Sequence, residues 1–181
     1  MARLTIRRAH ADDTAAIVAA HQHCWRETYG ASLPEAAYAI FTGATPVRRW
    51  DELLAARDAA DGSEIFVVCD PAGVMCGFAS CGRTQSHKLL AAGYTGEFFS
   101  IYLLSQAQRA GVGRALMRGM AAHLAATGVG DAAVWVLRDN PRARRFYEAL
   151  GGVDTGVAGV WPIAGLEMPD LAYGWRDLSV I

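Results

Sequence analysis

The segment 97–151 constrains the fold more than any other part of this sequence. Residues 97–104 form a mostly apolar, β-prone run that predicts a long strand, and a glycine-containing turn follows at 108–114. An amphipathic helix, the short apolar strand 132–137 and a second helix over 140–150 come next. Strands that alternate with helices in this way predict an α/β fold, because helices must bury their apolar stripes against a sheet.

The flanking segments add further strands and helices. Asp12 or Asp13 can cap a first helix, and residues 70–73 are a strong turn sequence between two strands. The elements expected outside the central segment are strands at 4–7, 64–69, 74–82, 153–161 and 166–176, helical stretches beginning near 13, 33 and 45, and a loop at 85–95. We therefore expect one sheet with helices on both faces, in a single domain that spans residues 1–181.

The composition argues against some classes of partner. The chain has 181 residues, of which 52% are hydrophobic and 19% charged, and its net charge is −1. This balance gives no reason to expect nucleic acid or an anionic membrane as a partner. The longest apolar stretches are too short to span a bilayer, and no apolar signal core precedes the acidic pair at 12–13. We expect a cytoplasmic protein.

The cysteines and histidines predict no redox or metal site. No CxxC pair occurs, and all cysteines but Cys24 lie in strand-like runs, which favours buried thiols. His21 and His23 are followed by no Cys, Asp or Glu at metal-site spacing, so we expect both at an exposed helix edge. The four cysteines are Cys24, Cys69, Cys76 and Cys81.

The turn at 108–114 offers a site for an anion. Glycines leave backbone N–H groups uncovered, and the N-terminus of the following helix adds its dipole. Arg109 and Arg114 bring positive charge to the same end. A Walker loop would need GxxxxGK[ST] after Gly111, and a dinucleotide fingerprint would need glycine where Leu116 stands, so neither motif fits. A plain tight turn, with glycines for packing only, is the alternative.

The residues around this turn resemble a known family. Gln108, Gly111 and Gly113 match the pattern [QR]-x-x-G-x-[GA], and with the segment 134–151 they resemble the GNAT superfamily of N-acetyltransferases. Two positions depart from the family's usual residues without defining the motif: Arg109 stands where glycine is frequent, and Ser105 where proline is frequent. The segments 24–30 and 172–178 are also similar to one large bacterial branch, so the resemblance covers nearly the whole chain.

The resemblance implies both a fold and a coenzyme site. It implies an acyl-CoA N-acyltransferase fold of the α/β class, a single mixed, mostly antiparallel sheet whose fourth and fifth strands splay apart. The pantetheine arm of acetyl-CoA would lie between those strands, with its pyrophosphate on the amides of the glycine turn. Asn140 would offer this amide-rich arm both a donor and an acceptor. The residues placed at the coenzyme are Ile101, Tyr102, Leu103, Gln108, Arg109, Ala110, Gly111, Val112, Gly113, Arg114, Asn140, Ala143 and Tyr147.

Transfer of an acyl group from a thioester to an amine needs a neutral amine, donors for the developing oxyanion and a proton for the leaving thiolate. Glu97 is the candidate base, since several relatives carry a glutamate at this position, eleven residues before Gln108. Tyr147 is the candidate acid, because a reference pKa near 10 suits proton delivery to a thiolate. Backbone amides near Tyr102 and Leu103 would hold the oxyanion. An exposed strand-end glutamate and a packing tyrosine are the alternatives.

The acceptor site is less defined. Trp25, Tyr29 and Trp161 are candidates to line it, with aromatic core packing as the alternative for each. The resemblance implies an N-acetyltransferase that moves an acetyl group from acetyl-CoA to a small-molecule or peptide primary amine by direct attack in a ternary complex. A non-catalytic acyl-CoA-binding sensor is the alternative. Many relatives are dimers, and the apolar tail 178–181 would pack either on a second copy or on its own sheet.

Overall fold

The computed structural model describes residues 4–30, 33–41, 44–56 and 62–181. In this part of the chain, seven strands form one sheet in the order β1-β2-β3-β4-β5-β7-β6. The strands are β1 (Thr5–Arg8), β2 (Glu64–Cys69), β3 (Met75–Arg83), β4 (Gly96–Leu103), β5 (Ala132–Leu137), β6 (Val153–Ile163) and β7 (Leu166–Trp175). β4 and β5 run parallel, whereas β1/β2, β5/β7 and β6/β7 are antiparallel. The predicted single mixed sheet is confirmed.

The helices also follow the predicted order, with two differences. The α-helices are α1 (Thr14–Tyr29), α2 (Ala44–Ala56), α3 (His87–Ala91), α4 (Val112–Ala126) and α5 (Pro141–Glu148), and the 3-10 helices are η1 (Ala11–Asp13), η2 (Glu35–Phe41), η3 (Ser105–Ala107) and η4 (Leu178–Val180). The helical stretch predicted from residue 33 is the 3-10 helix η2. The segment 85–95, predicted as a loop, contains α3, whose first turn is capped because the Ser86 hydroxyl accepts a hydrogen bond from Leu89 N at 3.4 Å.

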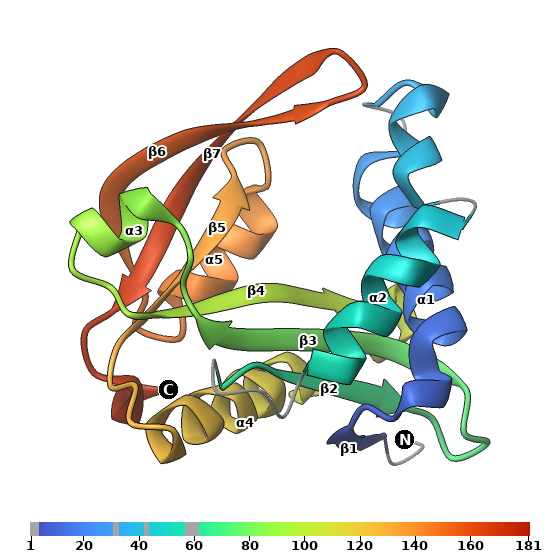
Figure 1. Ribbon diagram of the computed structural model, residues 1–181, viewed down its shortest axis with the longest axis horizontal. Coiled ribbons are helices and arrows are strands. Elements are labelled where there is room, and N and C mark those ends of the chain that lie inside the picture. Colours follow the sequence, from blue (N-terminus) through green and yellow to red (C-terminus); the bar gives the residue numbers. More distant parts are fainter. Residues whose placement is uncertain (1–3, 31–32, 42–43, 57–61) are drawn as a thin grey trace. The chain divides into compact units, whose positions relative to one another are not determined.

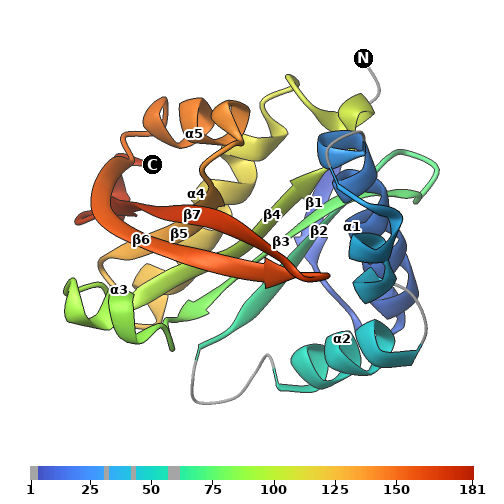
Figure 2. The same ribbon diagram turned by 90° about the horizontal axis from the view of Figure 1, so that it is seen from above.

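The chain divides into two compact units. The first comprises residues 1–80 and 100–116, and the second comprises residues 81–99 and 117–181. In the first unit, α1 and α2 lie side by side (Figures 1 and 2). Their apolar faces bury a core against β2 and β3 that includes Ile17, Trp50, Leu54, Val67 and Phe78.

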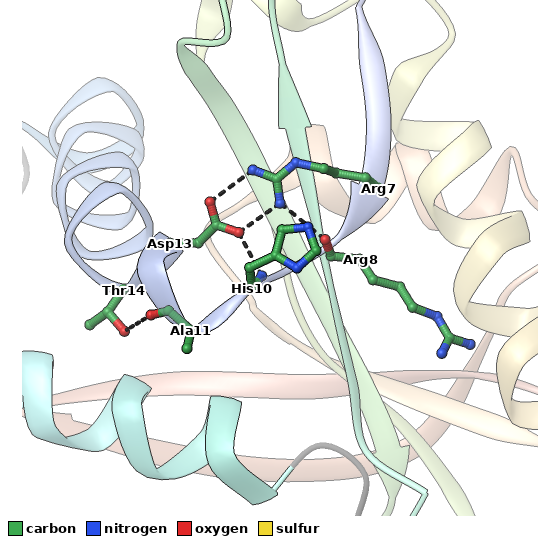
Figure 3. A network of polar contacts seen from close by, with 6 residues as sticks. All are labelled: Arg7, Arg8, His10, Ala11, Asp13 and Thr14. Carbon is green, nitrogen blue, oxygen red and sulfur yellow. Dashed lines mark hydrogen bonds and ion pairs between the residues drawn. The ribbon is translucent and has the colours of Figure 1, made fainter.

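Polar contacts fix the beginning of α1 to β1 within the first unit (Figure 3). The Arg7 guanidinium donates to both carboxylate oxygens of Asp13, at 2.7 and 2.8 Å, and also to the Arg8 carbonyl at 3.0 Å. Asp13 in turn accepts from His10 N at 2.7 Å. These bonds hold the pKa of Asp13 below its usual value, chiefly through the hydrogen bond from Arg7. Since Asp13 is the N-cap of α1, the bidentate pair ties the beginning of this helix to β1.

In the second unit, helices cover both faces of the strands. Tyr147 of α5 contacts the rings of Tyr173 and Trp175 in β7, whereas Leu89 of α3 clusters with Ala172 of the same strand. Odd- and even-numbered residues of a strand point to opposite faces, so α5 and α3 lie on opposite sides of β7 (Figure 2). This arrangement confirms the predicted two-sided cover.

The C-terminal tail packs on its own unit. Leu178 and Ile181 are buried, and Arg118 of α4 donates to the Ile181 carbonyl at 2.9 Å. Of the two alternatives for the tail, this packing agrees with the one in which the tail closes its own fold.

Candidate active site

The glycine turn is exposed and opens directly into α4. Arg109, Ala110 and Gly111 are all exposed, and Ala115 N donates to Gly111 O at 3.0 Å in the first helical bond. A Cβ at Gly111 would meet no atom within 4 Å, so this glycine is not required by packing. Its φ of 78° lies in the left-handed region, which favours glycine and turns backbone N–H groups outward. The alternative in which the glycines serve packing alone therefore does not hold at Gly111.

Arg109 adopts the same left-handed conformation, with a φ of 61°. A residue with a Cβ is strained there, and glycine is not. Glycine would relieve this strain. Arg109 keeps its charge beside the turn at the expense of backbone strain.

A carboxylate from α1 holds the backbone that precedes the turn. Glu27 accepts hydrogen bonds from Ser105 N and Ser105 Oγ, both at 2.8 Å. Gln108 Nε2 then donates to Leu103 O at 2.6 Å. A proline at position 105 would supply neither bond, so the clamp between Ser105 and Glu27 depends on the serine. Sequence reasoning missed Glu27, and the only available signal was the departure at Ser105.

An aromatic cluster lies beside β4 in the first unit. The Tyr102 side chain points toward α1, where its hydroxyl accepts from Trp25 Nε1 at 3.2 Å and its ring lies 4.5 Å from the His21 ring. Burial raises the pKa of Tyr102 to about 12. Trp25 is buried against this hydroxyl, and the half-buried Tyr29 lies 4.8 Å from the Trp25 ring.

The prediction for the two histidines was wrong in one case. His23 is exposed, as predicted, but His21 contacts the rings of Trp50, Phe78 and Tyr102. Burial lowers the pKa of His21 to about 3, with a smaller contribution from the charge of Arg49. His21 is therefore neutral at physiological pH, and its side chain packs as an aromatic ring.

Among the described residues, no cluster of His, Cys, Asp or Glu is arranged to hold a metal ion. All four cysteines are buried free thiols, as predicted.

The parallel ladder between β4 and β5 occupies the first two residues of each strand. Gly96 pairs with Ala132 and Glu97 with Ala133, while β4 continues to Leu103 and β5 to Leu137. Backbone groups of β4 beyond Glu97 lie outside this ladder. These include the residues 101–103 that the resemblance places at the pantetheine arm.

Glu97 is half-buried at the beginning of β4. Thr84 Oγ1 donates to Glu97 Oε2 at 2.5 Å. Burial raises the pKa of Glu97, and the hydrogen bond from Thr84 opposes this rise. A carboxylate with a raised pKa is a stronger base than one in water, so the environment of Glu97 suits proton abstraction.

The beginning and the end of α5 carry the other two predicted residues. Asn140 is the N-cap, and its Oδ1 accepts from Ala143 N at 3.1 Å. Tyr147 is 4% exposed and contacts the rings of Phe146, Tyr173 and Trp175. The ring of Tyr147 therefore has a packing role, whatever its hydroxyl does.

Strand register places Glu97 and Trp161 on one face of the second unit. Directly paired residues point to the same face, as do alternate residues of one strand. The pairs that establish this face are Glu97↔Ala133, Trp135↔Ala172, Leu137↔Asp170, Gly159↔Asp170 and Trp161↔Met168. Trp135 and Asp170, which the sequence did not single out, lie on this face too. Tyr147 packs on the other face, against Tyr173 and Trp175.

The fold and the site together define a class of protein. A single seven-stranded mixed sheet with helices matches the fold of solved acyl-CoA N-acyltransferases. The model of the acetyltransferase (GNAT) family matches residues 14–152, and the chain belongs to this family.

Individual relatives agree with this assignment. The chain is 32% identical over 178 residues to the uncharacterized N-acetyltransferase YuaI of Bacillus subtilis strain 168, covering 98% of this chain and 96% of the relative. The structure of YncA from Salmonella typhimurium with acetyl-CoA has a TM-score of 0.72 at 22% identity, covering 97% and 94% of the two chains. The PaiA N-acetyltransferase of Thermoplasma acidophilum in complex with coenzyme A has a TM-score of 0.70 at 13% identity, covering 93% and 98%. The two structural likenesses concern the fold.

No helix in the described residues has both the length and the apolar character that crossing a membrane requires.

Proposed function

We propose that this chain transfers an acetyl group from acetyl-CoA to a primary amine by direct attack in a ternary complex. The observation that carries the proposal is the half-buried carboxylate of Glu97, bonded to Thr84 on a sheet face that also presents Trp135 and Trp161. The choice of coenzyme is supported by the acetyl-CoA bound to YncA and the coenzyme A bound to PaiA.

The residues of this chain suit such a coenzyme. The exposed turn ending in Gly111 leaves space where a side chain would stand, and it opens into the N-terminus of the fifteen-residue helix α4. A helix N-terminus of this kind favours a pyrophosphate, and Arg109 adds positive charge. The β4 residues beyond the short ladder with β5 would offer backbone groups to the pantetheine arm. The coenzyme supplies the activated acetyl thioester.

Two side chains of the protein transfer protons during the reaction. Glu97, directly or through water, takes the proton that makes the acceptor nitrogen neutral, because an ammonium has no lone pair for attack. As the C–N bond forms, the nitrogen loses its second proton to solvent. As the C–S bond breaks, the Tyr147 hydroxyl gives its proton to the sulfur and is later reprotonated from solvent, to which Glu97 also returns its proton. Glu97 and Tyr147 belong to opposite faces of the strands of the second unit.

An amine panel with acetyl-CoA tests the function. We expect release of free coenzyme A thiol, above the rate without amine, for at least one primary amine. The acetylated product should appear in equal amount by mass spectrometry. Tight binding of acetyl-CoA with no turnover across the panel would contradict the proposal and favour the sensor alternative.

The variant Tyr147→Phe tests whether the Tyr147 hydroxyl acts as the general acid. The ring and its packing remain, so turnover should fall by roughly a hundredfold, the low end for losing a general acid, while coenzyme A binding changes little. Tyr38→Phe is a matched control, because the Tyr38 hydroxyl is buried without a hydrogen-bond partner among the described residues. Full turnover in Tyr147→Phe, measured where chemistry limits the rate, would leave Tyr147 as a packing residue.

A further inference from the structure

We propose that Asp170 binds a second ammonium group of the acceptor, so that the enzyme prefers linear amines carrying an additional positive charge. This inference rests on the proposed N-acetyltransferase function and names the class of amine that the site takes.

Asp170 is a half-buried carboxylate in the middle of a strand. Its Oδ1 atom is enclosed and has no hydrogen-bond partner among the described residues. Burial raises the pKa of Asp170, while the charge of Lys88 and the backbone N–H groups of Asp170 and Gly159 oppose that rise. Although these two backbone N–H groups lie near the carboxylate, Oδ1 is left without a well-formed hydrogen bond, and a cation at the carboxylate would compensate for this. Asp170 as a residue is partly exposed, although Oδ1 itself is enclosed.

Gly159 makes room for this carboxylate. A Cβ on Gly159 would lie 2.5 Å from Asp170 Oδ1 and 3.3 Å from Cζ3 of Trp135. Any side chain at Gly159 would therefore push the carboxyl group away from the indole. An ammonium group is stabilised both by a carboxylate and by the face of an indole, and the pair Asp170 and Trp135 presents both chemistries on one sheet face.

Lys88 does not neutralise Asp170 by direct contact. Its Nζ donates to the Ala158 carbonyl at 2.7 Å, and the described residues include no ion pair between Lys88 and Asp170. Lys88 is nevertheless near enough to lower the pKa of Asp170. It is thus the cation with which an acceptor ammonium would compete.

The position of Asp170 relative to Glu97 indicates an extended acceptor. Glu97 pairs with Ala133 of β5, and Asp170 of β7 pairs with Leu137 of β5. Leu137 lies four residues after Ala133 in β5. This offset corresponds to about 13 Å along the strands, and the two spacings from β4 across β5 to β7 add about 10 Å across them. One amine of the acceptor would give up its proton to Glu97, directly or through water. The amine at the other end of the acceptor molecule would reach Asp170.

A matched pair of amines tests the charge preference. With acetyl-CoA saturating, kcat/KM for 1,8-diaminooctane should exceed that for 1-aminooctane by at least roughly tenfold, the effect of one charge-assisted contact. Asp170→Asn keeps the shape and removes the charge, so it should abolish most of this preference. Equal preference in wild type and Asp170→Asn would overturn the inference.

Further variants separate binding from folding. Gly159→Ala should reduce the diamine preference by displacing the carboxyl, whereas Lys88→Met should increase it by removing the competing cation. Glu167→Gln, an exposed acid on the same strand, and Gly130→Ala, where a Cβ meets no atom within 4 Å, should leave the preference unchanged. If Glu167→Gln lowers the preference as much as Asp170→Asn does, general surface charge explains it and Asp170 has no special role.

A binding measurement keeps this inference distinct from the proposed function. In the presence of coenzyme A, 1,8-diaminooctane should raise the melting temperature of the wild type more than 1-aminooctane does, and Asp170→Asn should lose the difference. Turnover of 1-aminooctane with no preference for the diamine would contradict this inference but still support the proposed N-acetyltransferase function. Absence of turnover for every amine would contradict the proposed function. If the diamine raised the melting temperature equally in the wild type and in Asp170→Asn, Asp170 would have no role in binding it.

Discussion

Some individual residues in this chain destabilise the folded state, and the rest of the fold must compensate for them. Glu97 is a carboxylate with a pKa raised by burial, and Arg109 holds a left-handed backbone conformation. Both lie in segments that the proposed chemistry uses. Strain and buried charge of this kind collect at functional sites, where selection keeps them despite their effect on stability.

Glu97→Gln should make the protein more stable at neutral pH and less active. A group whose pKa is raised in the folded state stabilises the fold only at low pH, and that contribution is lost as pH rises through the folded-state pKa. Glutamine does not titrate, so the stability gain of Glu97→Gln should be present at pH 7 and absent below about pH 4. Urea unfolding at both pH values measures it. Lower stability of the variant at pH 7 would contradict the raised pKa.

The same variant has a kinetic signature. Without the base, turnover should recover as pH rises, because hydroxide can then supply the neutral amine. A rate–pH profile that coincides with the wild type at every pH would remove Glu97 from the mechanism.

Arg109→Gly should raise the free energy of unfolding by about 1 kcal/mol relative to Arg109→Ala. Both variants lose the guanidinium, and only glycine relieves the positive φ. Chemical denaturation of the two proteins side by side measures the difference. Equal stabilities would mean that the left-handed conformation at Arg109 is not strained.

At the scale of elements, one side chain often serves both the local structure and the site. Asn140 caps α5 through Oδ1, and this bond accounts for the residue without any coenzyme. Glu27 is a similar case, since it belongs to α1 and holds the backbone that leads into the glycine turn. Substitutions at such positions must separate the two roles.

Asn140→Asp and Asn140→Ala separate them for α5. Alanine removes the cap and should cost about 1 kcal/mol of stability. Aspartate keeps the accepting oxygen and should preserve stability, but it lacks the amide donor and should weaken coenzyme A binding. Titration calorimetry and urea unfolding give the two quantities. If Asn140→Asp binds coenzyme A as the wild type does, Asn140 is only a cap.

At the scale of the whole molecule, three elements run through both compact units. The unit boundaries fall inside β3, β4 and α4, between residues 80 and 81, 99 and 100, and 116 and 117. A break within a strand or helix would expose unpaired backbone groups, so neither unit has independent ends there. We propose that residues 1–181 fold as one domain.

Calorimetry tests this proposal together with the coenzyme turn. We expect one unfolding transition with equal calorimetric and van't Hoff enthalpies, and coenzyme A should shift the whole transition upward. Gly111→Glu should lose the shift, while Gly111→Ala, which shares the backbone strain without the negative charge, should retain it. Two separate transitions, only one of which responds to coenzyme A, would contradict a single domain.

The sequence alone determined the features that depend on local patterns. The strand 132–137 lies at the predicted residues because a short apolar run bounded by polar residues can be buried in few ways. The glycine turn and the start of α5 were also readable, since positive φ and helix capping each demand particular residue types.

Only the tertiary structure decided which distant residues meet. The burial of His21 depends on rings from three other elements, and the shared face of Glu97, Trp161 and Asp170 depends on register across four strands. A one-residue slip in any of these pairings would send a side chain to the opposite face. Register is set by packing between segments far apart in the chain, so periodicity within one segment does not contain it.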